Sequence, residues 1–301
     1  MKAIFTYALI FLSIASCTTT PVTTNKPQSV SPKDSLTEMS NTYSTPTKKP
    51  LYSTFVKDTF SIFESAPADY NKDSAKTYPL ILLLDANAFF EPLLADIKFN
   101  TLIGNIGECV ITGIGYKDFP SMDSLRSRDY TYPVAIPEYE MAISGGAPAF
   151  KNFIDKELVP KIKTDYKIDT QKIILCGHSL GGYFVLYYML QSAKENKYVA
   201  TNFVSASPSL HYNHRYLFGM EKQLYQAKAT CQGKLYISMG NKDMDDAESK
   251  HILGDFASQL KSRPYKALQL KADEYSNFGH IDAALPGFIK GLTYVFEEEK
   301  K

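Results

Sequence analysis

The segment from residue 173 to residue 190 constrains the fold of this chain more than any other. An apolar run, Ile173 to Cys176, leads into a G-x-S-x-G motif centred on Ser179, and a second apolar run able to form a helix follows from Tyr183 to Leu190. A strand, a sharp turn and a helix in this order are typical of a nucleophile elbow, which exposes its serine hydroxyl at the end of the strand. The alternative is a glycine-rich corner around a buried serine. We predict Ser179 as a catalytic nucleophile.

Length and composition allow one large domain. The chain has 301 residues, of which 44% are hydrophobic, and this is enough for a single core of roughly 250 residues. The formal net charge is +1 and no dense stripe of Lys or Arg is visible, so nothing points to nucleic acid. Beyond the first seventeen residues, three cysteines remain, Cys109, Cys176 and Cys231, and an odd number predicts no disulfide framework.

The N-terminus has the pattern of a targeting segment. Lys2 precedes an apolar stretch, Ala3 to Ile14, that is too short to span a bilayer as a permanent helix. It ends in Ile14-Ala15-Ser16-Cys17, which resembles the lipobox of bacterial lipoproteins. Residues 1–17 are therefore predicted to be a lipoprotein signal with lipid attachment at Cys17. An ordinary secretory signal or an uncleaved anchor are the alternatives.

Residues 18–50 are dominated by Thr, Ser, Pro and Lys, a composition that favours a disordered tether. Residues 51–301 would then form the catalytic domain. A lipid at Cys17 would be its only link to the membrane and would place it in the bacterial cell envelope, on a leaflet that the sequence does not identify. Protein partners are not predicted.

Apolar runs alternate with helical patterns along the rest of the chain. This alternation favours an α/β fold with a mostly parallel, doubly wound sheet flanked by helices, and in such sheets active sites gather where the strands end. An antiparallel pair is expected at 55–64, around Lys57-Asp58. Strands are predicted at 80–84, 109–114, 173–176, 200–205, 235–239 and 267–270, and helices at 147–163, 183–190, 247–262 and 282–297.

A serine nucleophile needs a base, and the base needs an acid that orients it. His280 follows the last predicted strand, which fits the order serine, acid, histidine along the chain. His211 is its main competitor, whereas His178 adjoins Ser179 and would point away from it. The acid is expected in the loop after 235–239, where Asp243 comes first.

Asp245 and Asp246 in the same loop remain alternatives to Asp243. A calcium loop is the rival interpretation, but the spacing lacks the central glycine and the terminal glutamate of an EF-hand. No metal site and no cofactor are predicted.

Two backbone N–H groups are expected to form an oxyanion hole. One belongs to Leu180, directly after the nucleophile. The other should come from the loop after the 80–84 strand, where Asn87 is the first choice and Ala86 the alternative.

Substrate contacts are expected from loops that border the site. Arg126 and Arg128 lie in a predicted loop, 116–140, and would suit an anionic substrate or an ester that carries a carboxylate. An internal Arg128–Asp129 ion pair is the alternative. Tyr130, His211 and Tyr212 are the other candidates for the pocket wall.

Taken together, these segments resemble the esterase family of α/β-hydrolases that includes enterochelin (siderophore) esterases, feruloyl and acetyl-xylan esterases and S-formylglutathione hydrolase. The resemblance covers about residues 53–297 and is nearest to the siderophore-esterase branch. Many relatives carry a tryptophan where this chain has His211-Tyr212, and the chain contains no Trp at all. The motifs that carry the resemblance are 78–79, 82–87, 128–131, 177–182, 205–210 and the loop of His280.

The resemblance implies an α/β-hydrolase without a separate lid domain that acts as a serine carboxylesterase. A siderophore trilactone or a carbohydrate or aryl ester would be its small-molecule substrate. Acyl transfer or thioester hydrolysis on the same fold is an alternative, although an exported protein would not meet a cytosolic thiol substrate. The third hypothesis is a non-catalytic lipoprotein that uses the fold to bind a ligand.

Overall fold

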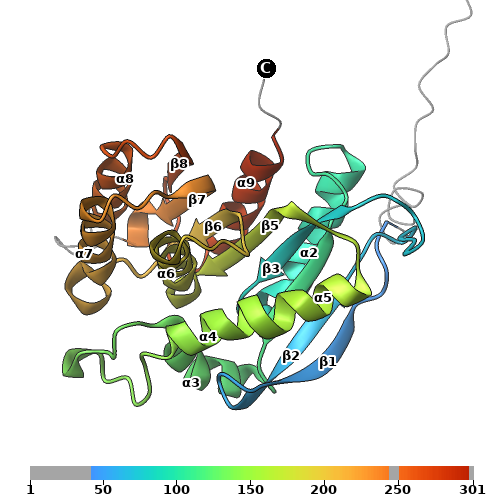
Figure 1. Cartoon of the computed structure of the whole chain (residues 1–301), viewed down its shortest axis with the longest axis horizontal. Helices are drawn as coiled ribbons and strands as arrows, with labels where there is room; N and C mark the ends of the chain where they lie inside the picture. Colours follow the sequence, from blue (N-terminus) through green and yellow to red (C-terminus); the bar gives the residue numbers. More distant parts are fainter. Residues whose placement is uncertain (1–41, 244–250, 298–301) are drawn as a thin grey trace, which may run out of the picture.

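The computed structural model describes residues 42–243 and 251–297, which form a sheet covered on both faces by helices (Figure 1). The eight strands of these residues are ordered β1-β2-β4-β3-β5-β6-β7-β8, and all neighbours from β4 to β8 run parallel. The predicted mostly parallel α/β fold is confirmed. The strands are β1 (Thr47–Ser53), β2 (Asp58–Ser65), β3 (Tyr78–Leu83), β4 (Val110–Gly115), β5 (Ile168–His178), β6 (Asn202–Ala206), β7 (Gln232–Gly240) and β8 (Ala267–Tyr275).

Two hydrophobic clusters form the core, one on each face of the sheet. The smaller cluster packs α2 and α9 against the strands, and the larger one packs the remaining helices on the opposite face. Residues Leu80 to Leu84 are fully buried, as expected for a continuous apolar run covered on both sides. The helices are α2 (Ala86–Leu102), α3 (Phe119–Tyr130), α4 (Ala147–Phe153), α5 (Val159–Asp165), α6 (Leu180–Glu195), α7 (Tyr212–Gln226), α8 (Ile252–Lys261) and α9 (Ala284–Phe296), with a π-helical turn (Ile154–Leu158) joining α4 to α5 and single 3₁₀ turns at Pro137–Tyr139 and Asn241–Asp243.

The N-terminal boundary of the folded part was predicted too far along the chain. Tyr43 is buried and its hydroxyl accepts a hydrogen bond from the Cys109 N–H at 3.2 Å, and β1 begins at Thr47, inside the predicted tether. The antiparallel pair expected at 55–64 is instead β1 with β2, joined by a turn at 54–57. The reason is that β1 is an edge strand, where lysine and proline discourage pairing with other chains, so its composition resembles that of a linker.

The predicted loop 116–140 contains a helix, α3. Its residues are mostly polar and only Met122, Asp129 and Tyr130 are buried, so no apolar periodicity revealed it. Its start is nevertheless encoded locally, because the Asp118 side chain accepts a hydrogen bond from the Ser121 N–H at 2.9 Å. The prediction also missed α2 and α7.

The predicted lipoprotein signal lies outside the described residues, as do Cys17 and most of the predicted tether. Within residues 42–243 and 251–297, none of the helices combines the length and the hydrophobicity needed to span a bilayer.

At the corner between β5 and α6, the backbone at the end of the strand packs directly against the backbone of the first helical turn. A Cβ atom placed on Gly177 would lie 2.4 Å from the Gly181 carbonyl oxygen, a contact that no side-chain movement can relieve. Glycine at position 177 is therefore a packing requirement of the corner.

We expect Gly177→Ala to lower the free energy of unfolding by about 2 kcal/mol or more, since overpacking of this kind typically costs 1–3 kcal/mol. Urea denaturation at neutral pH measures the change. Gly254→Ala on α8 is the matched control, because a Cβ there meets no atom within 4 Å and alanine favours a helix. Equal stability of Gly177→Ala and wild type would contradict the described packing.

Candidate active site

Ser179 occupies the turn that the sequence predicts for a nucleophile. Its backbone has φ 61° and ψ −121°, a conformation that costs a non-glycine residue about 1–3 kcal/mol. Three backbone hydrogen bonds hold it there. The Ser179 N–H donates to the Ala206 carbonyl at 3.0 Å, and the Ser179 carbonyl accepts from the N–H groups of Tyr183 and Ser209. The side chain is thus presented between the ends of β5 and β6, at the start of α6.

The structure brings His280 and Asp243 together although 37 residues separate them. The Nδ1 atom of His280 lies 2.7 Å from Oδ2 of Asp243. The histidine side chain is 39% exposed and the aspartate side chain 17%, so the pair lies at a partly open surface. An Nδ1–H that donates to the carboxylate leaves Nε2 as the ring atom able to accept a proton. Asp245 and Asp246, the alternative acids, lie outside the described residues.

Backbone contacts between two loops create this pair. The Lys242 N–H donates to the Phe278 carbonyl at 3.0 Å, and the Asn277 N–H donates to the Asn241 side chain at 2.8 Å. The end of β7 packs so tightly on this loop that a Cβ on Gly240 would lie 2.3 Å from the Phe278 oxygen. The loop after β7 and the loop after β8 therefore form one unit.

His178 connects this unit to the elbow. Its side chain is buried, and its Nε2 lies 2.9 Å from the His280 backbone carbonyl oxygen, so Nε2 carries the proton and donates it. The rings of His178 and His280 lie 4.6 Å apart, centre to centre. Burial lowers the pKa of His178 to about 4, with a further contribution from His280, which keeps its ring neutral at physiological pH. Sequence reasoning excluded His178 as the base and missed this positioning role.

The imidazole of His280 thus lies beside His178, the residue that precedes Ser179. Within the described residues, the Ser179 hydroxyl and the His280 ring form no direct hydrogen bond. Catalytic hydrogen bonds are often long in unliganded enzymes and shorten when substrate binds. Elbow, imidazole and carboxylate lie at one edge of the sheet, an arrangement suited to acyl transfer through a serine.

A buried ion pair supports the elbow from the other side. Asp85, at the end of β3, accepts two hydrogen bonds from Arg126 of α3, at 3.0 and 2.8 Å. The same guanidinium donates to the His178 carbonyl at 3.2 Å. Because a Cβ on Gly181 would lie 3.2 Å from the Asp85 carboxylate, the pair rests directly against the first turn of α6.

The expected donors of an oxyanion hole lie at two adjacent helix starts. Leu180 is the first residue of α6, and Ala86 and Asn87 are the first two of α2, so none of their N–H groups has an acceptor within its own helix. The Asn87 side chain is already bonded to the backbone of Tyr116. It accepts a hydrogen bond from the Tyr116 N–H at 2.6 Å and donates one to the Tyr116 carbonyl at 3.0 Å. Only the backbone of Asn87 remains for this role, and Ala86 stays an alternative.

The predicted substrate contacts need correction. Arg126 is bound to Asp85, and Arg128 is bound to Asp129 and Asp58, so both arginines brace the fold and the internal ion pair is the better interpretation. Tyr130 is fully buried, and its hydroxyl accepts from the Asp85 N–H. Tyr212 is also buried.

The Tyr212 hydroxyl donates to the Pro133 carbonyl, which anchors the loop that follows α3. Only His211, among the five predicted contacts, is exposed. The error arose because α3 was taken for a loop, which made its polar side chains seem available.

The pKa of His178 predicts a pH dependence of stability. A histidine with a pKa near 6.5 when unfolded and about 4 when folded binds more protons in the unfolded state between these values. Stability contributed by neutral His178 is therefore complete above pH 6.5 and is lost as the pH falls toward 4. Between pH 7 and pH 4.5 the loss amounts to about 2.5 kcal/mol.

We expect His178→Gln to reduce the fall in unfolding free energy between pH 7 and pH 4.5 by about 2 kcal/mol relative to wild type. Glutamine keeps an N–H donor for the His280 carbonyl and cannot be protonated. Urea denaturation of both proteins at the two pH values measures the difference. Identical pH profiles would show that His178 is not buried as a neutral ring.

Comparisons with known proteins agree with this geometry. Residues 54–279 match the family model described as "Putative esterase". The chain is 30% identical over 248 residues to ferri-bacillibactin esterase BesA of Bacillus subtilis, covering 77% of this chain and 82% of that protein. It is 29% identical over 222 residues to apo-salmochelin esterase of Escherichia coli, covering 68% and 65%.

Among solved structures, the fold is similar to that of the BES protein from Bacillus cereus. The TM-score is 0.72 at 24% identity, and the alignment covers 85% of this chain and 97% of that one. Fold, site geometry and sequence similarity point the same way: the chain belongs to this esterase family of α/β-hydrolases and is a serine hydrolase that acts on carboxylic esters.

Proposed function

We propose that this esterase hydrolyses the ester bonds of a siderophore through an acyl-enzyme on Ser179. The observation that carries the proposal is the Asp243–His280 pair, held beside a strained serine elbow by the bond from His178 to the His280 carbonyl. The substrate class is supported by the two relatives that act on siderophores by name, ferri-bacillibactin esterase and apo-salmochelin esterase.

In the proposed reaction, Nε2 of His280 accepts the hydroxyl proton while the Ser179 oxygen attacks the ester carbonyl. Asp243 orients the ring through Nδ1 and stabilises the imidazolium. The negative oxygen of the tetrahedral intermediate accepts hydrogen bonds from the N–H of Leu180 and from the N–H of Asn87 or Ala86. His280 then returns the proton to the leaving alcohol, and water, activated in the same way, releases the acid.

His178 would act as a positioning residue in this reaction. Because its pKa is about 4, the ring remains a neutral donor to the His280 carbonyl at neutral pH. It therefore fixes the loop that carries the general base without adding a second positive charge next to the imidazolium.

The site of action is part of the proposal. The N-terminal sequence, with the lipobox-like Ile14-Ala15-Ser16-Cys17, supports a lipoprotein held in the bacterial cell envelope by lipid on Cys17. A tether of about 25 residues would allow the domain to move roughly 25–30 Å from the lipid surface. A siderophore ester is a substrate that an exported enzyme could meet.

We expect His280→Ala to lower kcat/KM for a catecholate trilactone by about a thousandfold or more, the loss typical of a triad base. Ser179→Ala should abolish both turnover and labelling by a fluorophosphonate. Asp243→Asn should show a loss smaller than that of His280→Ala if Asp245 or Asp246 substitutes for it. Product release followed by liquid chromatography measures each rate.

His251→Ala serves as the matched histidine control and should stay within about threefold of wild type, because His251 is exposed at the start of α8. A loss under tenfold in His280→Ala, with a large loss in His211→Ala, would move the base to His211. Wild-type protein that cleaves aryl acetates but leaves trilactones intact would overturn the substrate while keeping the mechanism. Transfer to added alcohols in preference to water would indicate an acyltransferase.

The anchor is tested separately. We expect Cys17→Ser to abolish incorporation of radiolabelled palmitate and to release the protein from the membrane fraction, because serine lacks the thiol that is acylated. Membrane fractionation and labelling in bacterial cells measure both. Absence of label on the wild-type protein would favour an ordinary secretory signal, and catalysis by the soluble domain should be unaffected in either case.

A further inference from the structure

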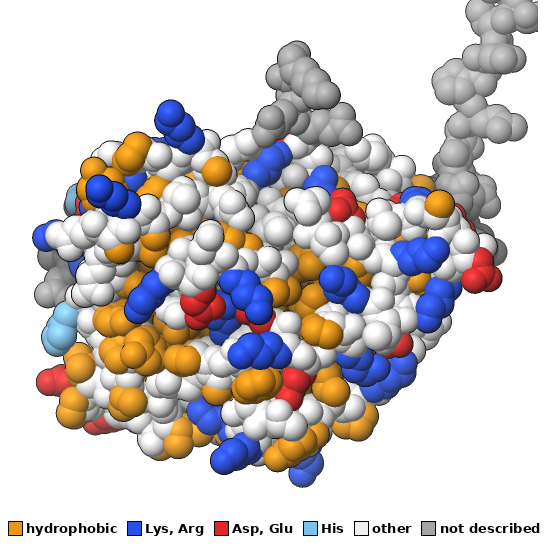
Figure 2. All heavy atoms as spheres, in the orientation of Figure 1, with side chains coloured by type: hydrophobic (Ala, Val, Ile, Leu, Met, Phe, Trp, Pro, Cys, Tyr) orange, Lys and Arg blue, Asp and Glu red, His pale blue; other side chains and the backbone are white. Residues whose placement is uncertain are grey.

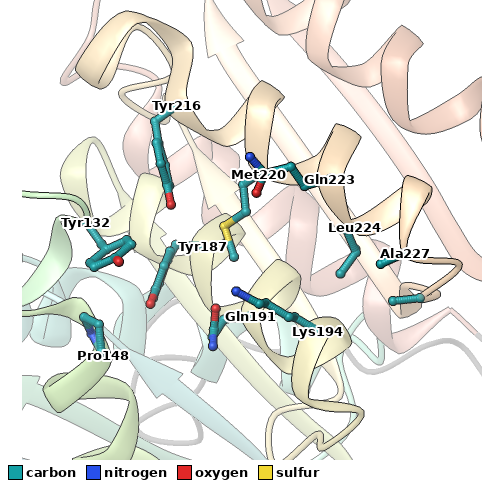
Figure 3. A pocket seen from close by; sticks show the side chains of 11 residues that line it. Tyr132, Pro148, Tyr187, Gln191, Lys194, Tyr216, Met220, Gln223, Leu224 and Ala227 are labelled. Carbon is teal, nitrogen blue, oxygen red and sulfur yellow. The ribbon is translucent and has the colours of Figure 1, made fainter.

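A cavity lies beside the C-terminal half of α6, away from Ser179 and His280. It has a volume of about 450 Å³ and is enclosed by α6, α7, the start of α4 and the loop after α3 (Figure 3). Hydrophobic side chains gather on the face seen in Figure 2, in the area where α6 and α7 lie in Figure 1. The residues that matter for the argument are Tyr132, Tyr187, Gln191, Lys194, Tyr216 and Met220.

The position on α6 separates this cavity from the proposed mechanism. At a rise of 1.5 Å per residue, Tyr187 and Lys194 lie about 12 and 22 Å from Ser179 along the helix axis. No residue of the cavity is used in the proposed reaction. Its volume is within the range of 300–1,000 Å³ that is typical of small-molecule sites.

Three tyrosine rings form one wall. The ring of Tyr132 lies 5.6 Å from that of Tyr187 and 5.9 Å from that of Tyr216, and it meets the latter edge to face. This geometry leaves ring faces and edges available to a further aromatic group. Tyr187 is only 2% exposed, and its side chain lines the cavity. Its phenolic O–H can donate a hydrogen bond to a ligand that enters the cavity.

A positive charge completes the cavity. Lys194 forms no ion pair or hydrogen bond with any described residue, and Figure 3 shows its amino group directed into the space between Tyr187 and Met220. Gln191 donates its amide N–H to Glu195 at 2.7 Å, which leaves its carbonyl oxygen free to accept a hydrogen bond. Burial raises the pKa of Tyr187 and Tyr216, so both remain neutral O–H donors.

The aromatic wall is fixed before any ligand arrives. The Tyr132 carbonyl accepts a hydrogen bond from Tyr183 at 2.6 Å, and the next residue's carbonyl accepts one from Tyr212 at 2.9 Å. The Asn213 side chain bonds both the Ile136 N–H and the Val134 carbonyl. A preorganised wall reduces the entropy lost on binding.

We propose that this cavity is a non-catalytic binding site for an aryl carboxylate. The aromatic ring of the ligand packs against the exposed sides of the Tyr132 and Tyr216 rings, and its carboxylate pairs with Lys194. The Tyr187 hydroxyl donates to the same carboxylate or to a ring substituent. A ring without charge would leave Lys194 unused, and a saturated acid would lose the contacts with the tyrosine rings.

The test is calorimetric titration of the full-length Ser179→Ala protein with benzoate, so that turnover plays no part. Benzoate should bind, while benzamide, which lacks the charge, and cyclohexanecarboxylate, which lacks the aromatic ring, should each bind at least about tenfold more weakly. Lys194→Gln and Tyr216→Leu should each weaken benzoate binding by about tenfold. Both side chains are at least partly exposed, and circular dichroism verifies that the variants fold.

Lys290→Gln is the matched control, since Lys290 is an exposed lysine on α9, across the sheet from the cavity. Its affinity for benzoate should equal that of the parent protein. The proposal is overturned if benzoate does not bind, or if Lys194→Gln and Tyr216→Leu bind it as well as the parent does. Because binding is measured without catalysis, neither result bears on whether Ser179 hydrolyses esters.

Discussion

The proposed active site depends on close backbone packing at the corner between β5 and α6. Ser179 holds a conformation that is unfavourable for any side chain larger than hydrogen, and it persists because Gly177 allows α6 to begin against the end of β5. Hydrogen bonds from Ser179 to Ala206 and from Ser209 to Ser179 join the corner to the neighbouring strand β6. The stability of the parallel sheet thus maintains the strained backbone of Ser179, the proposed nucleophile, at the ends of the strands.

The other proposed catalytic groups, His280 and Asp243, reach this corner through backbone contacts rather than through long-range charge. The loops after β7 and β8 are joined at Lys242 and Phe278, and the joined unit meets the elbow where His178 donates to the His280 carbonyl. Burial lowers the pKa of His178 to about 4, and the resulting neutral ring suits a donor placed next to the histidine that we propose as the general base. The loops that carry Asp243 and His280 are therefore held in place largely by hydrogen bonds of the main chain.

The buried Asp85–Arg126 pair has a comparable role. Removing two charges from water is costly, and buried ion pairs often add little net stability, so geometry is the better explanation of this one. Its bidentate contact links β3 to α3, and its third hydrogen bond reaches the His178 carbonyl. The Arg126 guanidinium is therefore engaged in hydrogen bonds within the protein. In contrast, Lys194 in the cavity proposed to bind an aryl carboxylate forms no ion pair with a described residue.

Local patterns determined much of this protein. Apolar runs, the glycine-flanked serine and the order of Ser179, Asp243 and His280 along the chain were sufficient to predict a parallel α/β fold, its elbow and the pair that meets at 2.7 Å. Only the tertiary structure showed that β1 is an edge strand, that α3 turns its arginines to Asp85 and Asp129, and that His178 holds the loop of His280. The physical reason is that periodicity and turn chemistry act over a few residues, whereas the partner of a charged or polar side chain comes from an element distant in the sequence.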